Sequence, residues 1–546
     1  MLPRLLAFSI FLSVTLPGCH TRQSGDLIVY NGVVYTVDNT FSKAEAFAVK
    51  DGKILAVGTD KDILNGYTAT QTVDAGGRAI YPGFIDAHAH FVGYGRSLYA
   101  ADLFGSTSSG EMVQRVQEFA KAHPGLAWIM GRGWDQNKFP DKTFPDNKKL
   151  NELFPNTPVL LERVDGHALL ANAKALELAG IKPGQQLPGG MIETKRGRLT
   201  GILVDNAKHL VMAVVPIPSF DEFAAQLGAA ERHCFAQGLT TVTDCGLGRK
   251  EIEGIDSLQQ SGKLRMRMYV MISDRPENLD YYIPKGPYKT DRLYVKGVKA
   301  YADGALGSRG ACLLQPYADR PGWSGFLLSS PDHFDSLAQR LQGTDFQLCT
   351  HAIGDSANRV ILTIYNKHLG GKNDKRWRIE HAQIIHDGDF DLFGKASIIP
   401  SVQPTHATSD MYWAGDRLGA QRLKGGYAYK QLLQQNGWIP LGTDFPVEDI
   451  SPFKTFLAAV FRVDAKGSPT GGFQPENALS REETIRGMTI WAAKADCLEK
   501  EIGSLEPGKK ADFIMLDRDL MKVSWDEVLQ TRVVSTWSGG MKVHSL

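Results

Sequence analysis

The sequence predicts an α/β protein whose main unit is a closed parallel (β/α)8 barrel of the TIM type, joined to a small discontinuous β-sandwich domain. Eight short apolar runs in the middle of the chain alternate with patches of helical spacing, a pattern typical of buried parallel strands joined by helices. Strand-like segments separated by turn dipeptides stand near both ends of the chain. A length of 546 residues accommodates one large barrel, one small domain and an insertion.

The first 18 residues predict a secretory signal peptide. Arg4 supplies a positive start, residues 5–16 are almost wholly apolar, and Leu16-Pro17-Gly18-Cys19 closes the segment. About 12 apolar residues are too few to cross a bilayer, which needs roughly 20. The tetrapeptide resembles the bacterial lipobox, so we expect Cys19 to be lipidated and to begin a short tether over residues 19–25. An ordinary signal peptide with an incidental cysteine is the alternative.

Lipidation at Cys19 predicts an exported protein that is anchored to a bacterial membrane. Two or three acyl chains would hold it firmly, because each buried methylene contributes about 0.8 kcal/mol. His20 follows Cys19 in place of the Asp that favours retention in the inner membrane. We therefore expect the periplasmic face of the outer membrane if the source has two membranes.

Residues 26–80 and 500–546 predict the two parts of the β-sandwich domain. Asp26–Tyr30 leads into Asn31-Gly32, a dipeptide typical of β-hairpins. Asp51-Gly52 separates two further strand-like runs, and similar runs return after residue 500. Because these pieces lie at opposite ends of the chain, the domain would be discontinuous, with the barrel inserted into it.

Residues 81–499 predict the barrel. Its eight apolar runs are residues 79–91, 240–244, 266–272, 294–301, 347–351, 377–381, 398–403 and 438–444. Apolar residues at helical spacing lie between several of these runs, as in 221–237 and 360–369. The stretch from about 95 to 235 is too long for one strand-to-helix crossover and contains its own turns, so we expect a cap inserted after the first barrel strand.

The composition excludes several classes of protein. The chain has 61 Lys and Arg against 60 Asp and Glu, whereas nucleic-acid-binding proteins usually carry a basic excess. A hydrophobic fraction of 43% is ordinary for a globular protein and argues against disorder. The cysteines show no CxxC spacing, which argues against a thiolate zinc site, and the odd number after Cys19 argues against a disulfide framework. The sequence leaves a homodimer open.

Residues able to bind a metal stand at the ends of several predicted strands. His88 and His90 lie two residues apart on the first strand, so both imidazoles face the same side. Four further strands end in such a residue, namely Lys299, His351, His381 and Asp444. Barrel enzymes gather their catalytic groups at this end, and four imidazoles with a carboxylate are ligands for Zn²⁺ or a similar divalent ion. A buried Lys299 needs a partner, and an ion pair with a nearby Asp is its structural alternative.

These motifs resemble the amidohydrolase superfamily. Residues 82–90, Pro-Gly-Phe-Ile-Asp-Ala-His-Ala-His, are very close to its opening strand, and the ordered set HxH, Lys, His, His and Asp matches its metal site. Residues 131–135, 298–309 and 378–383 look like the amidohydrolase-3 (YtcJ-like) branch, which includes N-substituted formamide deformylases. The resemblance runs from about Asp26 to the C-terminus. It is highly specific for the fold and the metal site and poorly specific for the substrate.

The resemblance implies a role for each matched residue. The two histidines of the first strand would hold the more buried metal together with Asp444, and His351 and His381 would hold a second. Lys299 would be carboxylated by CO₂ and bridge both metals as a carbamate. Some members of the superfamily work with one metal, so the resemblance implies one or two divalent ions per chain, with zinc expected.

The same residues predict a hydrolase. A bound metal lowers the pKa of water from 15.7 to about 7, and Asp444 would take the proton of this water and pass it to the leaving amine. The reaction would cleave a non-peptide C–N bond in an amide, an N-formyl group or a cyclic amide. An esterase or lactonase on the same scaffold is one alternative. A catalytically inactive solute-binding lipoprotein is another, although it predicts missing ligands and none is missing.

Five residues are expected to contact a small-molecule substrate in the pocket, namely Trp134, Asp135, His167, Arg309 and His406. The structural alternatives are packing inside the cap for the first two, a backbone contact for His167 and an ion pair for Arg309. By strand alternation Glu380 would point away from the cavity. Asp355 is expected to orient His351.

Overall fold

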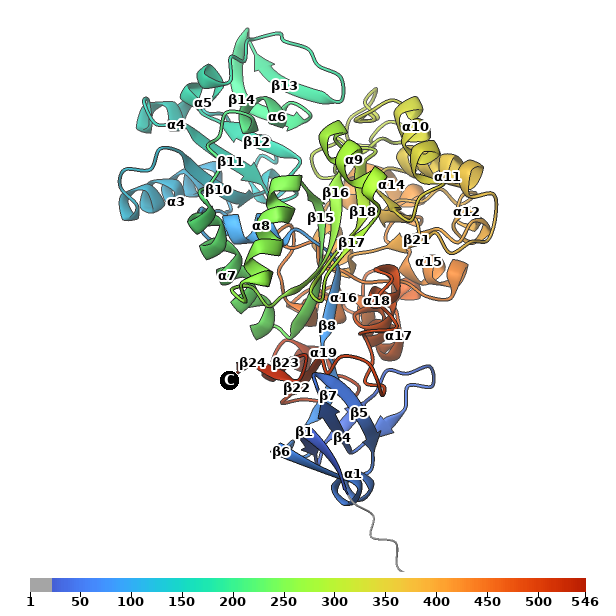
Figure 1. Ribbon diagram of the computed structural model, residues 1–546. Helices are drawn as coiled ribbons and strands as arrows, with labels where there is room; N and C mark the ends of the chain where they lie inside the picture. Colours follow the sequence, from blue (N-terminus) through green and yellow to red (C-terminus); the bar gives the residue numbers. More distant parts are fainter. Residues whose placement is uncertain (1–21) are drawn as a thin grey trace, which may run out of the picture.

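The computed structural model describes residues 22–546, and its centre is a barrel of parallel strands (Figure 1). Seven strands lie in the order β21-β20-β19-β18-β16-β15-β8, and each neighbouring pair is parallel. In chain order they are β8 (Phe84–Ala89), β15 (Leu239–Leu247), β16 (Arg267–Ser273), β18 (Leu293–Tyr301), β19 (Gln347–Ala352), β20 (Arg378–His381) and β21 (Ile399–Ser401). The short β17 (Tyr288–Lys289) pairs antiparallel with β18.

Residues 441–444 close the barrel between β21 and β8. The amide of Gly442 donates a hydrogen bond to the carbonyl of Val402 (3.0 Å), and the amide of Ala87 donates one to the carbonyl of Leu441 (3.2 Å). The predicted eighth strand therefore fills the eighth position, although it pairs through isolated bonds. The predicted fold class, an α/β protein with a (β/α)8 barrel, is confirmed.

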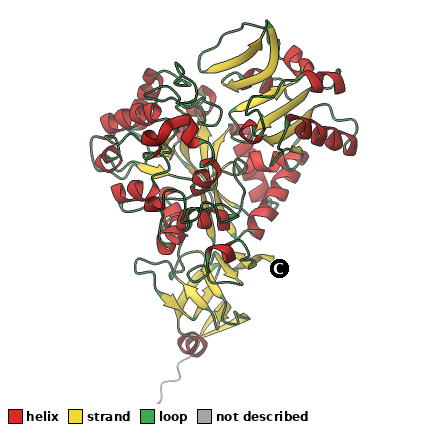
Figure 2. Ribbon diagram, turned by 180° about the vertical axis from the view of Figure 1, so that it is seen from behind, coloured by secondary structure: helices red, strands yellow, loops and turns green. Residues whose placement is uncertain are grey.

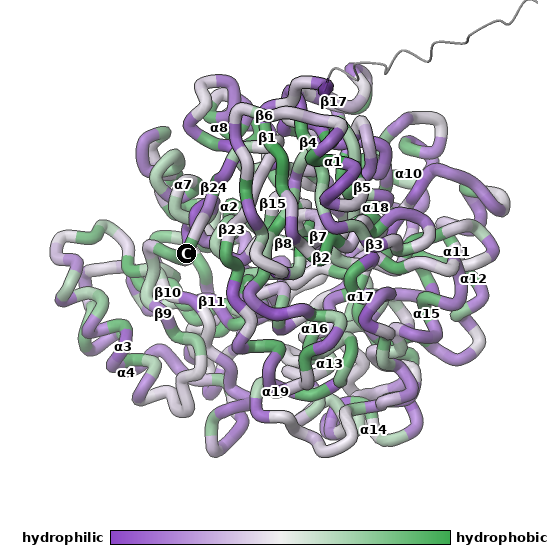
Figure 3. The backbone as a smooth tube through the Cα atoms, turned by 90° about the horizontal axis from the view of Figure 1, so that it is seen from below, coloured by the Kyte–Doolittle hydropathy of each residue, from purple (hydrophilic) through white to green (hydrophobic). Residues whose placement is uncertain are grey.

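Helices surround the barrel (Figure 2), as the alternation of apolar runs and helical patches predicts. They are α2 (Phe91–Ser97), α7 (Phe220–Ala236), α8 (Arg249–Gln260), α9 (Pro276–Tyr282), α10 (Pro331–Leu341), α11 (Asp355–Leu369), α12 (Asp391–Lys395), α13 (Pro404–Asp410), α14 (Ala414–Leu423), α15 (Tyr429–Asn436), α16 (Pro452–Val460), α17 (Arg481–Gly487) and α18 (Ile490–Ala495). Hydropathy follows this arrangement, with apolar residues on the central strands and polar residues on the outer helices and loops (Figure 3).

Two small sheets at the foot of the molecule combine both ends of the chain (Figure 1). One has the order β5-β4-β1-β6, from β1 (Gln23–Tyr30), β4 (Ala46–Lys50), β5 (Lys53–Gly58) and β6 (Tyr67–Asp74). The other has the order β24-β23-β22-β7-β2-β3, from β2 (Val33–Tyr35), β3 (Lys43–Ala44), β7 (Ala79–Pro82), β22 (Phe513–Leu516), β23 (Val533–Ser538) and β24 (Met541–Ser545). Helices α1 (Asp60–Gly66) and α19 (Trp525–Val528) also belong to the end segments. Phe47 packs edge-on against Phe513 with ring centroids 4.9 Å apart, so the two chain ends share one apolar core.

The predicted hairpin at Asn31-Gly32 is wrong. β1 and β2 flank this turn, yet β1 pairs with β4 and β6 in one sheet and β2 pairs with β3 and β7 in the other. Asn31 has the positive φ of 55° that such a turn needs. The dipeptide therefore sets the turn geometry, while partners distant in the sequence decide which sheet each strand joins.

The segment after β8 and α2 contains a second sheet, which lies above the barrel and forms the cap (Figure 1). Its order is β13-β14-β12-β11-β10-β9, from β9 (Ala101–Asp102), β10 (Ile129–Trp134), β11 (Val159–Arg163), β12 (Ala168–Ala171), β13 (Gly190–Lys195) and β14 (Arg198–Asp205). Helices α3 (Ser109–Ala122), α4 (Lys148–Leu153), α5 (Ala173–Leu178) and α6 (Lys208–Met212) accompany it. The insertion predicted to reach residue 235 overlaps α7, which packs against α2 and β15 of the barrel.

Within residues 22–546, no helix has both the length and the apolar character that crossing a membrane requires. The predicted signal peptide and Cys19 lie outside the described residues.

Candidate active site

A cavity of about 920 Å³ lies where the cap faces the carboxyl ends of the barrel strands. Arg132, Arg163 and His167 line it from the cap, and His351 and His381 line it from the barrel. Because the carboxyl ends of parallel barrel strands meet at one rim, polar residues at these ends converge in the cavity.

An aspartate two residues earlier fixes His88, the first of the two histidines at the end of the first barrel strand. Oδ1 of Asp86 accepts hydrogen bonds from the amides of His88 (3.1 Å) and Thr443 (3.0 Å), and Oδ2 accepts one from the Thr443 hydroxyl (2.7 Å). Burial raises the pKa of Asp86 to about 7, although these hydrogen bonds oppose the rise. Asp86 thus fastens the strand that carries His88 to the segment that carries Asp444.

Asp444 faces three imidazoles at once. Its Oδ1 lies 3.6 Å from Nε2 of His88 and 3.3 Å from Nε2 of His90, and its Oδ2 lies 3.3 Å from Nε2 of His406. Burial raises the pKa of this carboxyl, but the contacts with the imidazoles outweigh burial and hold its pKa well below its usual range. Asp444 is therefore an ionised carboxylate inside a ring of histidines.

His351 and His381, at the ends of β19 and β20, complete this ring. Their ring centroids lie 4.5 Å apart, and the His381 centroid lies 4.7 Å from that of His88. Nδ1 of His381 faces Oε1 of Gln403 at 2.7 Å, which fixes the ring and leaves Nε2 as its free nitrogen.

Lys299 is 1% exposed and lies beside the histidines. Its Nζ is 3.4 Å from Nε2 of His88 and 4.9 Å from the centroid of the Tyr301 ring. Among residues 22–546, no carboxylate oxygen lies within 4.0 Å of Nζ of Lys299, the limit for an ion pair. The ion pair with an aspartate, the structural alternative for this residue, is therefore not formed in the part of the chain that the structure describes.

The donor set fits a divalent metal. One ligand atom from each of His88, His381 and Asp444 lies within 4.8 Å of the other two, and all three residues are buried. Nε2 of His351 and Oδ1 of Asp444 are buried and have no hydrogen-bond partner among the described residues. Since buried polar atoms are normally paired, these two atoms indicate a missing ligand. Imidazole nitrogens and a carboxylate are what zinc takes in catalytic sites.

The tight group differs from the division that the resemblance implies. That division puts His88 with Asp444 at one metal and His381 at a second, whereas His88, His381 and Asp444 form one close group here. The closeness of the three suits an ion that all of them share. The ligand roles of the six predicted residues and the number of ions stay predictions.

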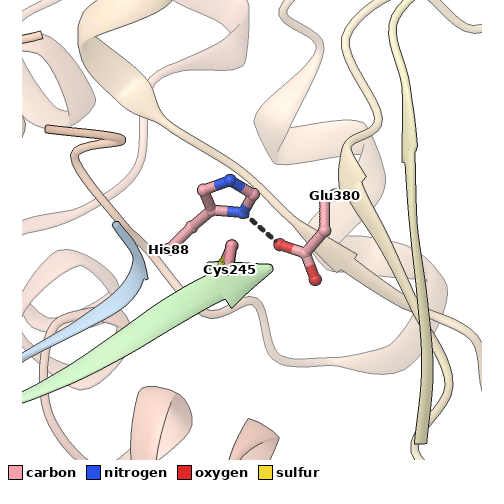
Figure 4. Close-up of side chains that lie close together, drawn as sticks. All are labelled: His88, Cys245 and Glu380. Atoms are coloured by element: carbon pink, nitrogen blue, oxygen red, sulfur yellow. Dashed lines mark hydrogen bonds and ion pairs between the residues drawn. The ribbon is translucent and has the colours of Figure 1, made fainter. Parts of the chain in front are cut away.

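A second close group, His88, Cys245 and Glu380, lies deeper in the barrel (Figure 4). Nδ1 of His88 contacts Oε2 of Glu380, and Nε of Arg378 lies 2.6 Å from Oε1 of the same carboxylate. Burial raises the pKa of the Cys245 thiol well above its usual value, so the sulfur stays protonated. The carboxylate of Glu380 contacts both His88 and Arg378 and so orients His88, while the Cys245 thiol lies 3.9 Å from the carbonyl of Thr243.

As expected, Glu380 does not line the cavity, but its side chain lies inside the barrel and not on the outer face. Glu380 contacts His88, and its neighbour His381 belongs to the ring at the rim. Strict alternation would place two consecutive residues on opposite faces. His381 has a φ of 72° and Ala382 a φ of 42°, so the strand ends here and alternation no longer applies.

The structure separates the five expected substrate contacts into two groups. Asp135, His167 and His406 line the cavity, whereas Trp134 and Arg309 do not. Trp134 is fully buried in the cap, where its indole donates a hydrogen bond to the carbonyl of Leu161 (2.9 Å). Arg309 forms an ion pair with Asp319 at 2.8 Å.

Sequence reasoning missed several residues that support the site. Asp303, and not Asp355, is the carboxylate near His351: its Oδ1 lies 3.8 Å from Nε2 of that ring. Asp355 instead accepts a hydrogen bond from the amide of Leu314 (2.9 Å). Asp205 contacts His167 with 2.7 Å between Oδ1 and Nδ1. Asp303 stands two residues beyond the strand that carries Lys299, which is a usable signal, whereas nothing local in the sequence marks Asp205.

The profile of the amidohydrolase family matches residues 71–544. Protein LONG AFTER FAR-RED 3 of Arabidopsis thaliana is 33% identical over 95% of this chain and 91% of its own. YtcJ of Bacillus subtilis (strain 168) is 30% identical over 90% of this chain and 94% of its own. The N-substituted formamide deformylase of Arthrobacter pascens is 26% identical over 95% of this chain and 98% of its own.

A solved structure agrees with these sequence matches. The crystal structure of an uncharacterized metal-dependent hydrolase from Pyrococcus horikoshii superposes with a TM-score of 0.75 at 28% identity, covering 91% of this chain and 99% of that one. These matches cover 90–95% of this chain, and the family profile spans the barrel, the cap and the histidine ring. The protein belongs to the amidohydrolase family.

Proposed function

We propose that the protein is a metal-dependent hydrolase that cleaves a non-peptide C–N bond in a small molecule. One observation carries the proposal: a buried ring of histidines around the ionised Asp444, with two unpaired ligand atoms, faces a cavity of about 920 Å³. A ring without a cavity would suit a structural metal, and a cavity without the ring would suit a binding protein. The two together suit a metal hydrolase.

The metal would be held by the predicted set of His88, His90, His351, His381 and Asp444, with zinc the expected ion. When bound, the ion supplies water of lowered pKa and polarises the substrate carbonyl. Lys299 is a candidate further ligand. Its ammonium has no lone pair, so it would act as a ligand after CO₂ has converted it to a carbamate, and its lack of a carboxylate partner favours that modification.

Asp444 is the proposed base and acid of the reaction. Its carboxylate would take the proton of the attacking water and later deliver it to the leaving nitrogen. His406 steadies Oδ2 from one side while its own Nδ1 lies 3.0 Å from Oε1 of Glu448. Gln403 fixes the ring of His381 in the same way. These contacts hold the reacting groups still, which proton transfer at a defined atom requires.

N-substituted formamides are the proposed first substrates to test. The relative from Arthrobacter pascens carries this activity in its name, and it matches 95% of this chain. The cavity has room for a substituent on the nitrogen, and Tyr94, Tyr301 and Trp413 lie among its apolar lining residues. Asp135, His167 and His406 are the proposed substrate contacts.

Metal content and turnover of the purified protein test this function. We expect one or two zinc ions per chain by elemental analysis, hydrolysis of N-substituted formamides, and loss of zinc together with activity in Lys299→Ala. Asp335→Asn, which alters an exposed ion pair with Lys367, is the matched control and should change neither quantity. A protein that binds no zinc after incubation with zinc and bicarbonate would refute the proposal.

We further propose that the protein is exported and lipid-anchored through Cys19. The support is the sequence of residues 1–19, with its basic start, short apolar core and lipobox-like end. Cys19→Ala should move the protein from the membrane fraction to the soluble fraction and abolish labelling by radioactive palmitate. Retention of the label in that variant would contradict a lipid on Cys19.

A further inference from the structure

A pair of side chains from the cap, Asp205 and His167, lies against the histidine ring of the barrel. His167 stands in the turn between β11 and β12, and Asp205 ends β14. Oδ1 of Asp205 is 2.7 Å from Nδ1 of His167, and the amide of Asp205 donates a hydrogen bond to the carbonyl of His167 (2.8 Å). Two contacts in opposite directions therefore lock the two residues together.

The barrel leaves room for this carboxylate. A Cβ atom at Gly304 or at Gly310 would lie only 2.5 Å from Oδ2 of Asp205, so both positions must be glycine for the side chain to fit. Asp205 has a φ of 51°, and its side chain is fully buried. Its Oδ2 has no hydrogen-bond partner among residues 22–546. A strained, buried carboxylate held in a space cleared by two glycines indicates a specific task.

The role of the Asp205 carboxylate concerns Nε2, the second ring nitrogen of His167. An ionised carboxylate only accepts hydrogen bonds, so Nδ1 of His167 carries the proton that faces Asp205 and Nε2 lies at the far side of the ring. The ring centroid of His167 is 5.0 Å from that of His351, and both residues line the cavity. No hydrogen bond joins Nε2 of His167 to a residue of the described chain.

We infer that the cap supplies this pair to the active site: Asp205 is a positioning residue that fixes the ring of His167, and Nε2 of His167 contacts the substrate beside the metal ligands. The inference rests on the proposed function, because it assumes a substrate at the metal ring. It explains why the 303–311 loop packs against the end of β14. It also makes the cap part of the catalytic machinery.

The test uses the full mature chain loaded with zinc. His167→Asn keeps an amide nitrogen where Nδ1 stood, so the contact with Asp205 survives while the Nε2 side of the ring is removed. We expect unchanged zinc content and unchanged thermal stability. Turnover of an N-substituted formamide should fall about 30-fold, the size of one hydrogen bond to a charged or reacting group. Binding of inorganic phosphate, a tetrahedral anion like the intermediate of amide hydrolysis, should weaken about tenfold by calorimetry.

Asp205→Asn is the second variant, and it tests the same pair independently in case His167→Asn does not fold. An amide can donate or accept, so it fixes neither the tautomer nor the orientation of His167. We expect a smaller loss, about five- to tenfold in kcat with little change in KM, and weaker phosphate binding. His333→Asn alters a similar histidine–aspartate contact, 2.6 Å from Asp274 on the exposed surface, and should change nothing.

The results separate this inference from the proposed function. If His167→Asn has the kcat and the phosphate affinity of the parent while Asp205→Asn only melts earlier, the pair is a structural clasp and the inference is wrong. A parent protein that binds no phosphate overturns it as well. If the parent binds phosphate, loses affinity in both variants and yet hydrolyses none of the amides, the proposed substrate class fails and the contact stands.

Discussion

Two clusters of buried polar side chains lie in the same barrel, and they differ in how their charges are met. The rim ring consists of His88, His90, His351, His381 and Asp444. The Arg378 cluster, below it, consists of Arg378, Glu380, Asp496, Thr243 and Ser401. Both are buried except for His90, whose side chain is 30% exposed. In the rim ring several imidazoles share one carboxylate and four members line the cavity, whereas the Arg378 cluster lies away from the cavity and its guanidinium lies between two carboxylates.

The Arg378 cluster ties several elements together. The guanidinium of Arg378 lies 2.6 Å from Glu380 and 3.1 Å from Asp496, and it donates hydrogen bonds to the carbonyl of Ala87 (2.6 Å) and the hydroxyl of Ser401 (2.8 Å). The hydroxyl of Thr243 donates to Asp496 (2.8 Å). Because Arg378 of β20 is linked to Ala87 of β8, Ser401 of β21 and Asp496 after α18, and Asp496 in turn to Thr243 of β15, the cluster stabilises the closed barrel. The comparison teaches that burial alone does not mark a functional site, whereas buried polar groups that line a cavity do.

The largest effect should follow from Asp444→Asn in the rim ring. The amide keeps the shape but cannot take a proton, so kcat should fall about 10³- to 10⁴-fold, the upper part of the range for acid–base catalysis. The free energy of unfolding should change less than in the next variant, because this carboxylate faces a cavity and not the packed barrel. Steady-state kinetics and denaturant unfolding of the same preparation measure both. A variant with more than a tenth of the parent kcat would assign the proton transfer to another residue.

Arg378→Met should lower the free energy of unfolding more than it lowers kcat. The substitution leaves Glu380 and Asp496 buried without their cation, which typically destabilises a protein by about 3–5 kcal/mol. The midpoint of urea unfolding of the metal-free protein measures the loss. Arg376→Met is the matched control, since Arg376 also faces two carboxylates, Asp374 and Glu499, but in a partly exposed site, where water offsets more of the loss. Equal losses in the two variants would mean that the buried cluster has no special role.

The sequence predicted the rim ring better than the Arg378 cluster for a physical reason. His88, His351, His381 and Asp444 each stand where an apolar run ends, and strand ends of a parallel barrel meet at one rim. Local patterns therefore locate them. Asp496 comes from the end of α18, more than a hundred residues after Arg378, and no local pattern brings these two together.

The same limit explains the individual errors. Asn31-Gly32 has the right turn geometry, but the strands on either side find partners elsewhere. Glu380 lies away from the cavity, but strand alternation did not predict its contact with His88, because the positive φ of His381 ends the alternation there. The place of Arg309 after the Lys299 strand predicts a side chain in the pocket. The guanidinium instead forms an ion pair with Asp319, ten residues later. Each error depends on a strand pairing or a side-chain contact that the local sequence does not specify.

Metal should stabilise the protein through the rim ring alone. At a free zinc concentration of 100 times Kd, binding to the folded state adds about 2.7 kcal/mol to the free energy of unfolding. Thermal unfolding with and without zinc should show this gain in the parent and in Arg378→Met, because the latter keeps its ligands. Asp444→Asn, which lacks one ligand, should gain clearly less at the same zinc concentration. An equal gain in all three proteins would place the ion elsewhere.

The smallest effect is a pH dependence that belongs to the Arg378 cluster. Burial raises the pKa of Asp496 to about 7, against the attraction of Arg378, while in the unfolded chain the carboxyl titrates near its ordinary pKa of about 3.9. Between these two values the folded protein keeps a proton that the unfolded chain has lost. This group therefore lowers stability as pH rises from about 4 to 7, by at most about 1.4 kcal/mol per pH unit, and adds no slope above that window.

Asp496→Asn should remove this slope, since the amide does not titrate in the window. The difference in free energy of unfolding between the parent and the variant, measured in urea at several pH values from 4.5 to 8.5, isolates Asp496 from the other buried carboxyls. We expect the variant to gain relative to the parent as pH rises through the window, and the difference to become constant above it. A difference that does not vary with pH would mean that Asp496 is already ionised in the folded protein at pH 4.5. Arg378 would then hold both of its carboxylates in their ionised forms, and burial would not raise the pKa of Asp496.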